Sequence, residues 1–178
     1  MLYIITPCSR PQNLETISNS IPNKSSWIVV HDYKYIMPDI PNATFLKCDD
    51  TGLVGTKARN FALDTIKFND DDYILFHDDD NIIHPKLYQT IEPLLTNNFS
   101  IMTWGQLHKN NSIRLPSQVK PKVGNIDTAS FLISWKYNKL TRHRTDIYEH
   151  DGLYAEECAN NGPMLCINDY LCYYNYLR

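Results

Sequence analysis

The chain lacks the features that mark several large classes of protein. Its 178 residues carry 17 Lys and Arg against 20 Asp and Glu, so no basic surplus exists with which to hold nucleic acid. No apolar run approaches the roughly 18 residues that a membrane-spanning helix needs. The first residues carry no basic stretch and only a short apolar run, so we expect neither a signal peptide nor a transmembrane segment.

The cysteines also lack a pattern. There are five of them, an odd number, and no two have the C-x-x-C spacing of zinc and redox sites. We therefore expect reduced thiols in a cytoplasmic protein. Four N-x-S/T sequences are attributed to chance, because the chain is rich in Asn.

Two common nucleotide-binding signatures are missing as well. Neither the P-loop pattern G-x-x-x-x-G-K-[ST] nor the pattern G-x-G-x-x-G occurs in the chain. A different phosphate site is nevertheless conceivable at Gly55, which precedes a helix start that carries Lys57 and Arg59. Backbone N–H groups and cations at such a start receive phosphate, but an ordinary solvated helix start has the same sequence.

The composition that is present belongs to a globular protein. Hydrophobic residues make up 43% of the chain and charged residues 21%, both near the usual values, so the chain is able to bury a core of its own. The length predicts a single domain over residues 1–178. The 12 Tyr exceed what a plain core needs and favour some surface rings that stack on a ligand.

Apolar runs alternate with helical patterns in the first half of the chain. We expect strands at residues 2–5, 27–30, 44–47 and 73–76, and helices after residue 9, after the glycine loop 51–55 and over 85–95. The helix after the glycine loop is predicted to bury Ala58, Phe61, Ala62 and Ile66. This alternation predicts an α/β fold, with a mostly parallel central sheet and helices on both of its faces.

The second half has a different pattern of predicted strands and helices. Strands are expected at residues 100–107, 112–115, 127–133 and 165–167, with one helix over 151–161 that ends at Gly162. The spacing predicts an irregular, partly antiparallel half. The expected boundary between the halves lies between residues 99 and 100.

The strongest chemical signal is the acidic run 78–81 (DDDN), directly after a buried strand. Ligands of open α/β sheets bind at the carboxyl ends of strands. Alternate side chains of an extended segment point the same way, so Asp78 and Asp80 are able to share a cation while Asp79 points elsewhere. Carboxylates and water suit Mg²⁺ or Mn²⁺. An acidic turn without a metal is the alternative.

The order of these motifs resembles that of the GT-A glycosyltransferases, which use nucleotide-diphosphate sugars. The front half is similar to the glucuronyltransferase-like branch at four landmarks: residues 5–11 (ITPCSRP), 29–32 (VVHD), 57–63 (KARNFAL) and 76–81 (FHDDDN). The branch carries a second arginine before its helix, where this chain has Val54. The resemblance implies a nucleotide-sugar-binding half over residues 1–99.

The back half resembles the broader group of inverting GT-A enzymes. Residues 125–133 (NIDTASFLI) are similar to an acceptor-side strand, and residues 150–162 to the acidic motif, helix and closing glycine of that group. Asp151 then matches the catalytic base, although His150 replaces the first acidic residue. An ordinary helix cap has the same sequence. Glu156 and Glu157 are the alternative bases, and Glu149 is a weaker one.

The resemblance implies a metal-dependent transfer of a sugar, from UDP in particular, to a hydroxyl of a glycan or other acceptor, with inversion. The implied donor-binding residues are Thr6, Pro7, Ser9, Arg10, Asp32, Lys57, Arg59, Asp78 and Asp79. The implied ligands of Mn²⁺ or Mg²⁺ are Asp80 and Asp78. On the acceptor side, over residues 100–178, we expect Trp104 and Asp127, although core packing explains Trp104 equally well.

Two other classes of function remain open. The chain could bind a sugar nucleotide or glycan without turnover, as a module of a larger assembly. It could instead be a nucleotidyltransferase that makes a sugar nucleotide from a sugar phosphate. Such enzymes have a glycine-rich basic loop after the first strand, whereas residues 7–11 (PCSRP) contain no glycine.

Overall fold

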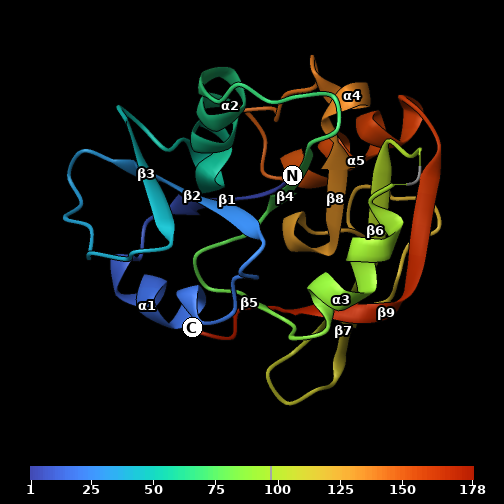
Figure 1. The fold of residues 1–178 in the computed structure, drawn as a ribbon, viewed down its shortest axis with the longest axis horizontal. Helices are drawn as coiled ribbons and strands as arrows, with labels where there is room; N and C mark the ends of the chain where they lie inside the picture. The colour runs from blue at the N-terminus through green and yellow to red at the C-terminus, as the bar shows by residue number, and fades with distance from the viewer. Residues whose placement is uncertain (97) are drawn as a thin grey trace.

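A computed structural model describes residues 1–96 and 98–178, which form one sheet with helices packed on it (Figure 1). The strands are β1 (Leu2–Cys8), β2 (Ser25–Asp32), β3 (Ala43–Cys48), β4 (Tyr73–Phe76), β5 (Ile82–Ile83), β6 (Ile101–Leu107), β7 (Ile113–Leu115), β8 (Phe131–Ser134) and β9 (Met164–Tyr173). Their order is β3-β2-β1-β4-β8-β6-β9-β5, and β7 pairs with β6.

The α-helices are short, apart from two. They are α1 (Leu14–Ser18), α2 (Thr56–Thr65), α3 (Leu87–Ile91), α4 (Trp135–Asn138) and α5 (His150–Asn160). Single 3₁₀ turns stand at Pro11–Asn13, Leu53–Gly55, Glu92–Leu94 and Thr128–Ser130. Within the described residues, none of these helices combines the length and the apolar character that a membrane crossing requires.

The first half is parallel, as the alternation of strands and helices predicted. β1 pairs with β2 on one side and β4 on the other, and β2 pairs with β3, all in parallel. The carboxyl ends of β1, β2 and β4 therefore meet at one edge of the sheet. Asp78 and its neighbours follow β4 at that edge, beside the loop that follows β1.

Strand alternation divides the buried side chains between two faces. Ile4 packs in one apolar cluster with residues of α1 and α3, and Ile5 packs in a second with residues of α2 and α5. In Figure 1, α1 and α3 lie in the lower part of the molecule, whereas α2 and α5 lie in the upper part. Each fully buried aliphatic side chain contributes roughly 1.5–3 kcal/mol. The expected helices on both faces are therefore confirmed.

The second half mixes both strand directions. β8 is antiparallel to β4 and β6, whereas β9 is parallel to β6 and antiparallel to β5. β9 is longer than the predicted strand at 165–167. Its register against β6 shifts between the pairs Thr103–Cys166 and Gly105–Tyr170, so that polar residues which resemble a turn lie inside a bulged strand.

Three predicted elements are corrected. Asp127 does not begin a strand: its side chain caps the turn Thr128–Ser130, and β8 starts at Phe131. The helix predicted over 85–95 is α3 followed by a separate 3₁₀ turn at Glu92–Leu94, which carries a proline. The first helix is likewise reduced to α1 after a 3₁₀ turn.

The inward face of α2 also differs from the prediction. Phe61 is exposed, whereas Arg59 and Leu63 are buried beside Ala58 and Ala62. The inward positions therefore include a buried arginine. An apolar periodicity does not anticipate this, because a charged residue is assigned to the solvent face unless a partner for it is known.

Candidate functional site

A cleft of about 510 Å³ opens at the edge where β1 and β4 end. The first half contributes the loop after β1, the loop before α2 and the acidic run, and the second half contributes segments near residues 114, 127, 150 and 175. A larger hollow of about 870 Å³ lies against α1 and α3, but its lining includes none of the site residues expected from the sequence. The cleft is therefore the candidate site.

Asp79 ties the loop after β1 to the acidic run. Its Oδ2 accepts hydrogen bonds from Ser9 N at 2.6 Å, Ser9 Oγ at 3.0 Å and Arg10 N at 2.7 Å, and its Oδ1 pairs with the Arg10 guanidinium. Asn13 Nδ2 donates to its backbone oxygen at 2.8 Å. Both carboxylate oxygens are thus engaged by the chain. Arg10 Nη1 also lies 3.1 Å from Asp80 Oδ2, so one guanidinium joins the two carboxylates.

Asp78 and Asp80 are each paired with arginine through one oxygen. Asp78 Oδ1 contacts the guanidinium of Arg59. Asp80 Oδ2 lies 3.1 Å from Arg10 Nη1 and 2.5 Å from Arg178 Nε. Burial, together with the nearby Asp78 charge, raises the pKa of Asp80. The second oxygen of each carboxylate, Asp78 Oδ2 and Asp80 Oδ1, has no protein hydrogen bond within the described residues.

The loop before α2 is held in a strained shape. Gly52, Val54 and Gly55 have φ of 75°, 43° and 83°, and a positive φ is unfavourable for a β-branched residue. The buried Arg59 donates from Nη1 to the Val54 carbonyl at 2.7 Å while its other nitrogen pairs with Asp78. One guanidinium therefore joins this loop to the acidic run.

Asp151 stands in the first turn of α5 and faces the cleft. It accepts a hydrogen bond from Gly152 N at 2.8 Å. Burial, and then the negative charges of Asp127 and Asp78, raise the pKa of Asp151 from 3.8 to about 6. A carboxylate with a pKa near the working pH is suited to accept a proton from a substrate. Asp151 does lie at the helix start, as the sequence predicted, but burial outweighs the stabilisation of the anion that a helix start gives.

Asp127 lies in the cleft lining beside Asp151. Its carboxylate accepts from Gln106 Nε2 at 3.2 Å and lies 3.1 Å from Arg114 Nη2, while it caps the turn that precedes β8. Burial and the nearby Asp78 charge raise its pKa. Its chain contacts hold it in place, and its charge in turn acts on Asp151.

Two histidines support the start of α5. His150 lines the cleft, and its Nδ1 lies 3.1 Å from Nδ1 of the buried His143, which stacks on Tyr154. Burial and the nearby Arg59 charge lower the pKa of His150 to about 3 and also lower that of His143. Both rings are therefore neutral at physiological pH, and one donates a hydrogen bond to the other.

Sequence reasoning missed Arg114 and Arg178, which line the cleft together with Tyr174. The Arg114 guanidinium lies 3.5 Å above the Tyr174 ring. Neither arginine belongs to a motif, and they are 64 positions apart in the chain. The parallel pairing of β6 with β9 and the course of β7 bring them together.

Several expected donor residues lie outside the cleft lining. Thr6 is buried and accepts a hydrogen bond from Trp27 Nε1 at 3.0 Å. Asp32 pairs with Lys34 at 3.0 Å, and Lys57 pairs with Asp50 at 2.6 Å on the exposed surface. Pro7, Ser9, Arg10, Arg59, Asp78 and Asp79 do line the cleft.

Some residues of the second half that were expected at the site also lie outside the cleft lining. Trp104 is buried, and its Nε1 donates to the Ala129 carbonyl at 3.0 Å, so the core alternative is correct. Glu156 accepts from Val123 N at 2.8 Å, and neither it nor the exposed Glu157 lines the cleft. Among the alternative bases, Glu149 does line it.

The donor set at Asp78 and Asp80 fits a hard divalent cation completed by a ligand. Within the described residues, no three His, Cys, Asp or Glu side chains are gathered as a metal-binding group. Mg²⁺ sites, however, commonly take one or two carboxylates, with phosphate oxygens and water as the other ligands. The unpaired oxygens of Asp78 and Asp80 supply such a pair. The cleft lining holds six carboxylates against four arginines, so it also favours positive charge.

The comparisons with known proteins identify the fold. No protein-family model matches the chain, and no curated protein matches it. Residues 1–349 of S. aureus TarS superpose with a TM-score of 0.70 at 14% identity, over 97% of this chain and 59% of that one. The chain thus spans about three fifths of that structure.

Two further solved structures are similar over most of their own length. The inositol-1-phosphate CTP transferase from T. maritima has a TM-score of 0.56 at 10% identity, over 97% of this chain and 87% of that one. The 2-C-methyl-D-erythritol 4-phosphate cytidylyltransferase of Francisella tularensis has 0.53 at 13%, over 93% and 90%. The chain has the GT-A-like α/β fold of these neighbours, as its motif order led us to expect.

Proposed function

We propose that the chain is a glycosyltransferase that moves a sugar from a nucleotide-diphosphate donor, UDP in particular, to a hydroxyl of a glycan or similar acceptor. The observation that carries the proposal is the cleft itself. It gathers the acidic run of the first half and Asp151 of the second half at the carboxyl ends of the parallel strands. The glycosyltransferase TarS among the structural neighbours supports the same class of reaction.

The donor is assigned to the side of the cleft formed by the first half. Ser9 and Arg10, tied to Asp79, and the strained loop before α2 form its walls. A diphosphate adds negative charge to a lining that already has more carboxylates than arginines. Asp80 and Asp78 would hold a divalent cation that balances this charge, and when bound the cation would supply the Lewis acid that stabilises the departing nucleoside diphosphate.

The acceptor is assigned to the side formed by the second half. Asp151 removes the proton of the acceptor hydroxyl, whose oxygen attacks the anomeric carbon as the bond to the diphosphate breaks. The electron pair of that bond leaves with the nucleoside diphosphate, so one displacement inverts the anomeric centre. Burial, and then the charge of Asp127, raises the pKa of Asp151 to about 6. The neutral His143–His150 pair supports the start of α5. From the motif order, we further propose that the donor half is similar to the glucuronyltransferase-like branch.

Nucleotidyl transfer is the second candidate. The observation in its favour is that two such enzymes are covered over 87% and 90% of their length, more than TarS. Against it, the loop after β1 contains no glycine, and Arg10 N and Ser9 N, which could otherwise receive phosphate, both donate to Asp79. This closes the place where a triphosphate would be held.

The proposed binding of a nucleotide donor is tested by thermal unfolding with UDP, GDP, CMP and ATP, each with and without Mn²⁺. A ligand at 100 times its dissociation constant adds roughly 2.7 kcal/mol, which is about 5–10 °C for a chain of this size. We expect UDP to raise the Tm only when Mn²⁺ is present. Asp80→Asn should remove the shift, because it removes a charged ligand.

The matched control is Asp70→Asn. Asp70 belongs to an acidic run of the same composition, but it is exposed and pairs with Lys139 at 2.5 Å, away from the cleft. This variant should keep the full shift. The assignment of the donor site would be contradicted if none of the nucleotides raised the Tm, with or without Mn²⁺. It would also be contradicted if Asp80→Asn showed the same rise in Tm as the wild type.

A further inference from the structure

Residues 174–178, which we name the C-terminal strap, cross the acidic run. The strap follows β9 as a turn, and Tyr174 N donates to the Leu107 carbonyl at 2.8 Å. Asn175 N donates to Asn81 Oδ1 at 2.8 Å, and Leu177 N donates to the Asp80 carbonyl at 3.0 Å. Three backbone N–H groups thus fasten a chain segment close to the candidate cation ligands.

Arg178 brings a charge to this crossing. Its Nε lies 2.5 Å from Asp80 Oδ2; the Arg178 side chain is 54% exposed, whereas that of Asp80 is 3% exposed. Arg10 is the second cation on the same oxygen, but it is also held on Asp79 through its backbone and its guanidinium. Among the described contacts of Arg178, its side chain has Asp80 as its partner. Arg178 is therefore the cation at Asp80 that is able to leave without disturbing the wall of the cleft.

We propose that the C-terminal strap regulates the donor site, with Arg178 as a counter-ion of Asp80 that competes with the binding of a divalent cation and a nucleoside diphosphate there. This inference rests on the proposed function, which places the cation at Asp80. Arg178 contacts Asp80 Oδ2, and a cation on the unpaired Asp80 Oδ1 would lie close to that guanidinium, where the two positive charges repel. Arg178 and the cation therefore compete for Asp80.

Asn175 is the proposed hinge of the strap. Asn175 has φ of 47°, a left-handed conformation that asparagine tolerates better than most residues, and it lies between the parts of the strap held by Leu107 and by Asp80. Arg114 lies over the Tyr174 ring and anchors the start of the strap. A change in backbone angle near Asn175 would lift Arg178 while Tyr174 stays in place. Once lifted, Arg178 is free to face the added diphosphate.

Titration of Mn²⁺ alone into the whole chain, followed by the electron paramagnetic resonance of free Mn²⁺, tests the proposal. Removal of a competing counter-ion raises the fraction of binding-competent molecules, and a strap closed in nine molecules of ten predicts an increase of about tenfold in Mn²⁺ affinity for Arg178→Gln. Arg178→Lys keeps the charge and should stay near the wild type. Arg144→Gln removes an exposed arginine that pairs with Asp146 at 2.8 Å outside the cleft, and should change nothing.

The failure of this inference is distinct from that of the proposed function. Equal Mn²⁺ affinity in the wild type and Arg178→Gln, with binding in both, overturns the strap and leaves the donor site intact. An equal gain in Arg144→Gln also overturns it, since the effect would then be one of net charge. If Mn²⁺ binds neither protein, with or without UDP, both the cation at Asp80 and its regulation are rejected. Circular dichroism of each variant confirms that it is folded.

Discussion

At the residue scale, Asp79 and Asp151 are two aspartates of the same cleft with different surroundings. Asp79 is saturated by donors from Ser9 and Arg10, so it serves to hold a loop. Asp151 has a single backbone donor, and burial, followed by the negative charges of Asp127 and Asp78, raises its pKa to about 6. These surroundings make Asp79 a structural residue and support the proposed role of Asp151 as the proton acceptor.

Asp151→Asn is expected to abolish turnover while donor binding persists. A general base contributes about 10²–10⁴-fold to the rate, and the amide cannot accept the proton. In the wild type, kcat should rise as pH increases through about 6, because the base must be ionised. The measurement is kcat from pH 4.5 to 8, with donor binding by calorimetry alongside. A flat profile, or an active Asp151→Asn, would reject this base and turn attention to Glu149.

The same substitution predicts a change in stability. A carboxyl group whose folded pKa lies above its unfolded value costs stability when it is ionised, so the cost is absent below pH 4 and complete above pH 6. Asp151→Asn should therefore be more stable than the wild type at pH 7.5, on the order of 1–3 kcal/mol, and equal to it near pH 4. Urea unfolding at both pH values gives the comparison. Equal stability at pH 7.5 would mean that the carboxylate is not strained by its neighbours.

At the element scale, the approach of α2 to β1 depends on one glycine. A Cβ on Gly55 would lie 2.6 Å from Pro7 Cβ, and the φ of Gly55 is 83°. Gly55→Ala should therefore cost about 2–4 kcal/mol, from backbone strain and from overpacking together. Gly124 has φ of 86° with open space around its Cβ position, so Gly124→Ala measures the strain alone, about 1 kcal/mol. Equal losses in urea unfolding would show that the contact with Pro7 is soft.

Local pattern anticipated the elements that rest on local chemistry. The parallel strands of the first half, α2, α5 and the position of the acidic run follow from apolar runs, a glycine loop and their order. The local pattern did not predict the two-residue strand β5 or the full length of β9, because both depend on pairing partners that are distant in sequence. Sequence reasoning assigned Arg59 to the donor site or to solvent, and not to the interior. Its partners Val54 and Asp78 come together with it only in the folded chain.

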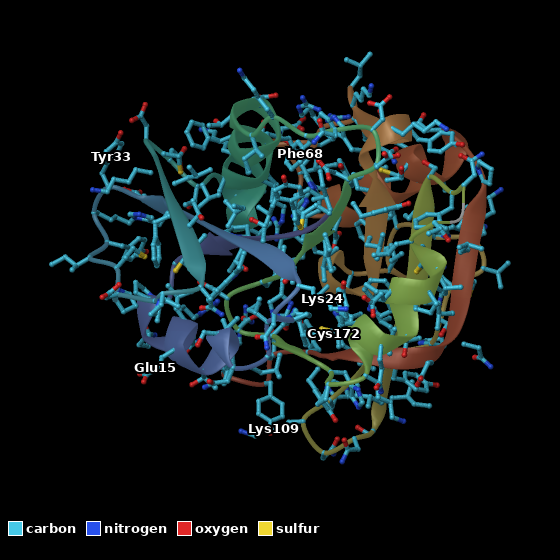
Figure 2. All side chains as sticks on the ribbon, viewed as in Figure 1. Glu15, Lys24, Tyr33, Phe68, Lys109 and Cys172 are labelled. Atoms are coloured by element: carbon cyan, nitrogen blue, oxygen red, sulfur yellow. The ribbon has the colours of Figure 1, made fainter. Side chains whose placement is uncertain are left out.

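At the scale of the whole molecule, the site is a product of both halves. Arg114, Asp127 and Asp151 reach the acidic run because β8 pairs with β4 and the sheet continues through β6 and β9. Figure 2 shows that side chains from both halves surround the sheet. The cleft is lined by residues of both halves. Sequence reasoning found the acidic run and Asp151 separately. It did not find Arg178, which pairs with Asp80, or Arg114, which pairs with Asp127, because isolated basic residues carry no pattern.

The most direct test of the central claim is the fate of the donor, followed by ¹H NMR of the whole chain with UDP-glucose, UDP-galactose, UDP-N-acetylglucosamine or UDP-glucuronic acid and Mn²⁺. The proposed function predicts that one donor is consumed to UDP and that the first sugar released has the β configuration, opposite to that of the donor. Asp80→Asn should abolish consumption. Consumption of none of these donors, or pyrophosphate release from UTP or CTP with a sugar 1-phosphate, would contradict it.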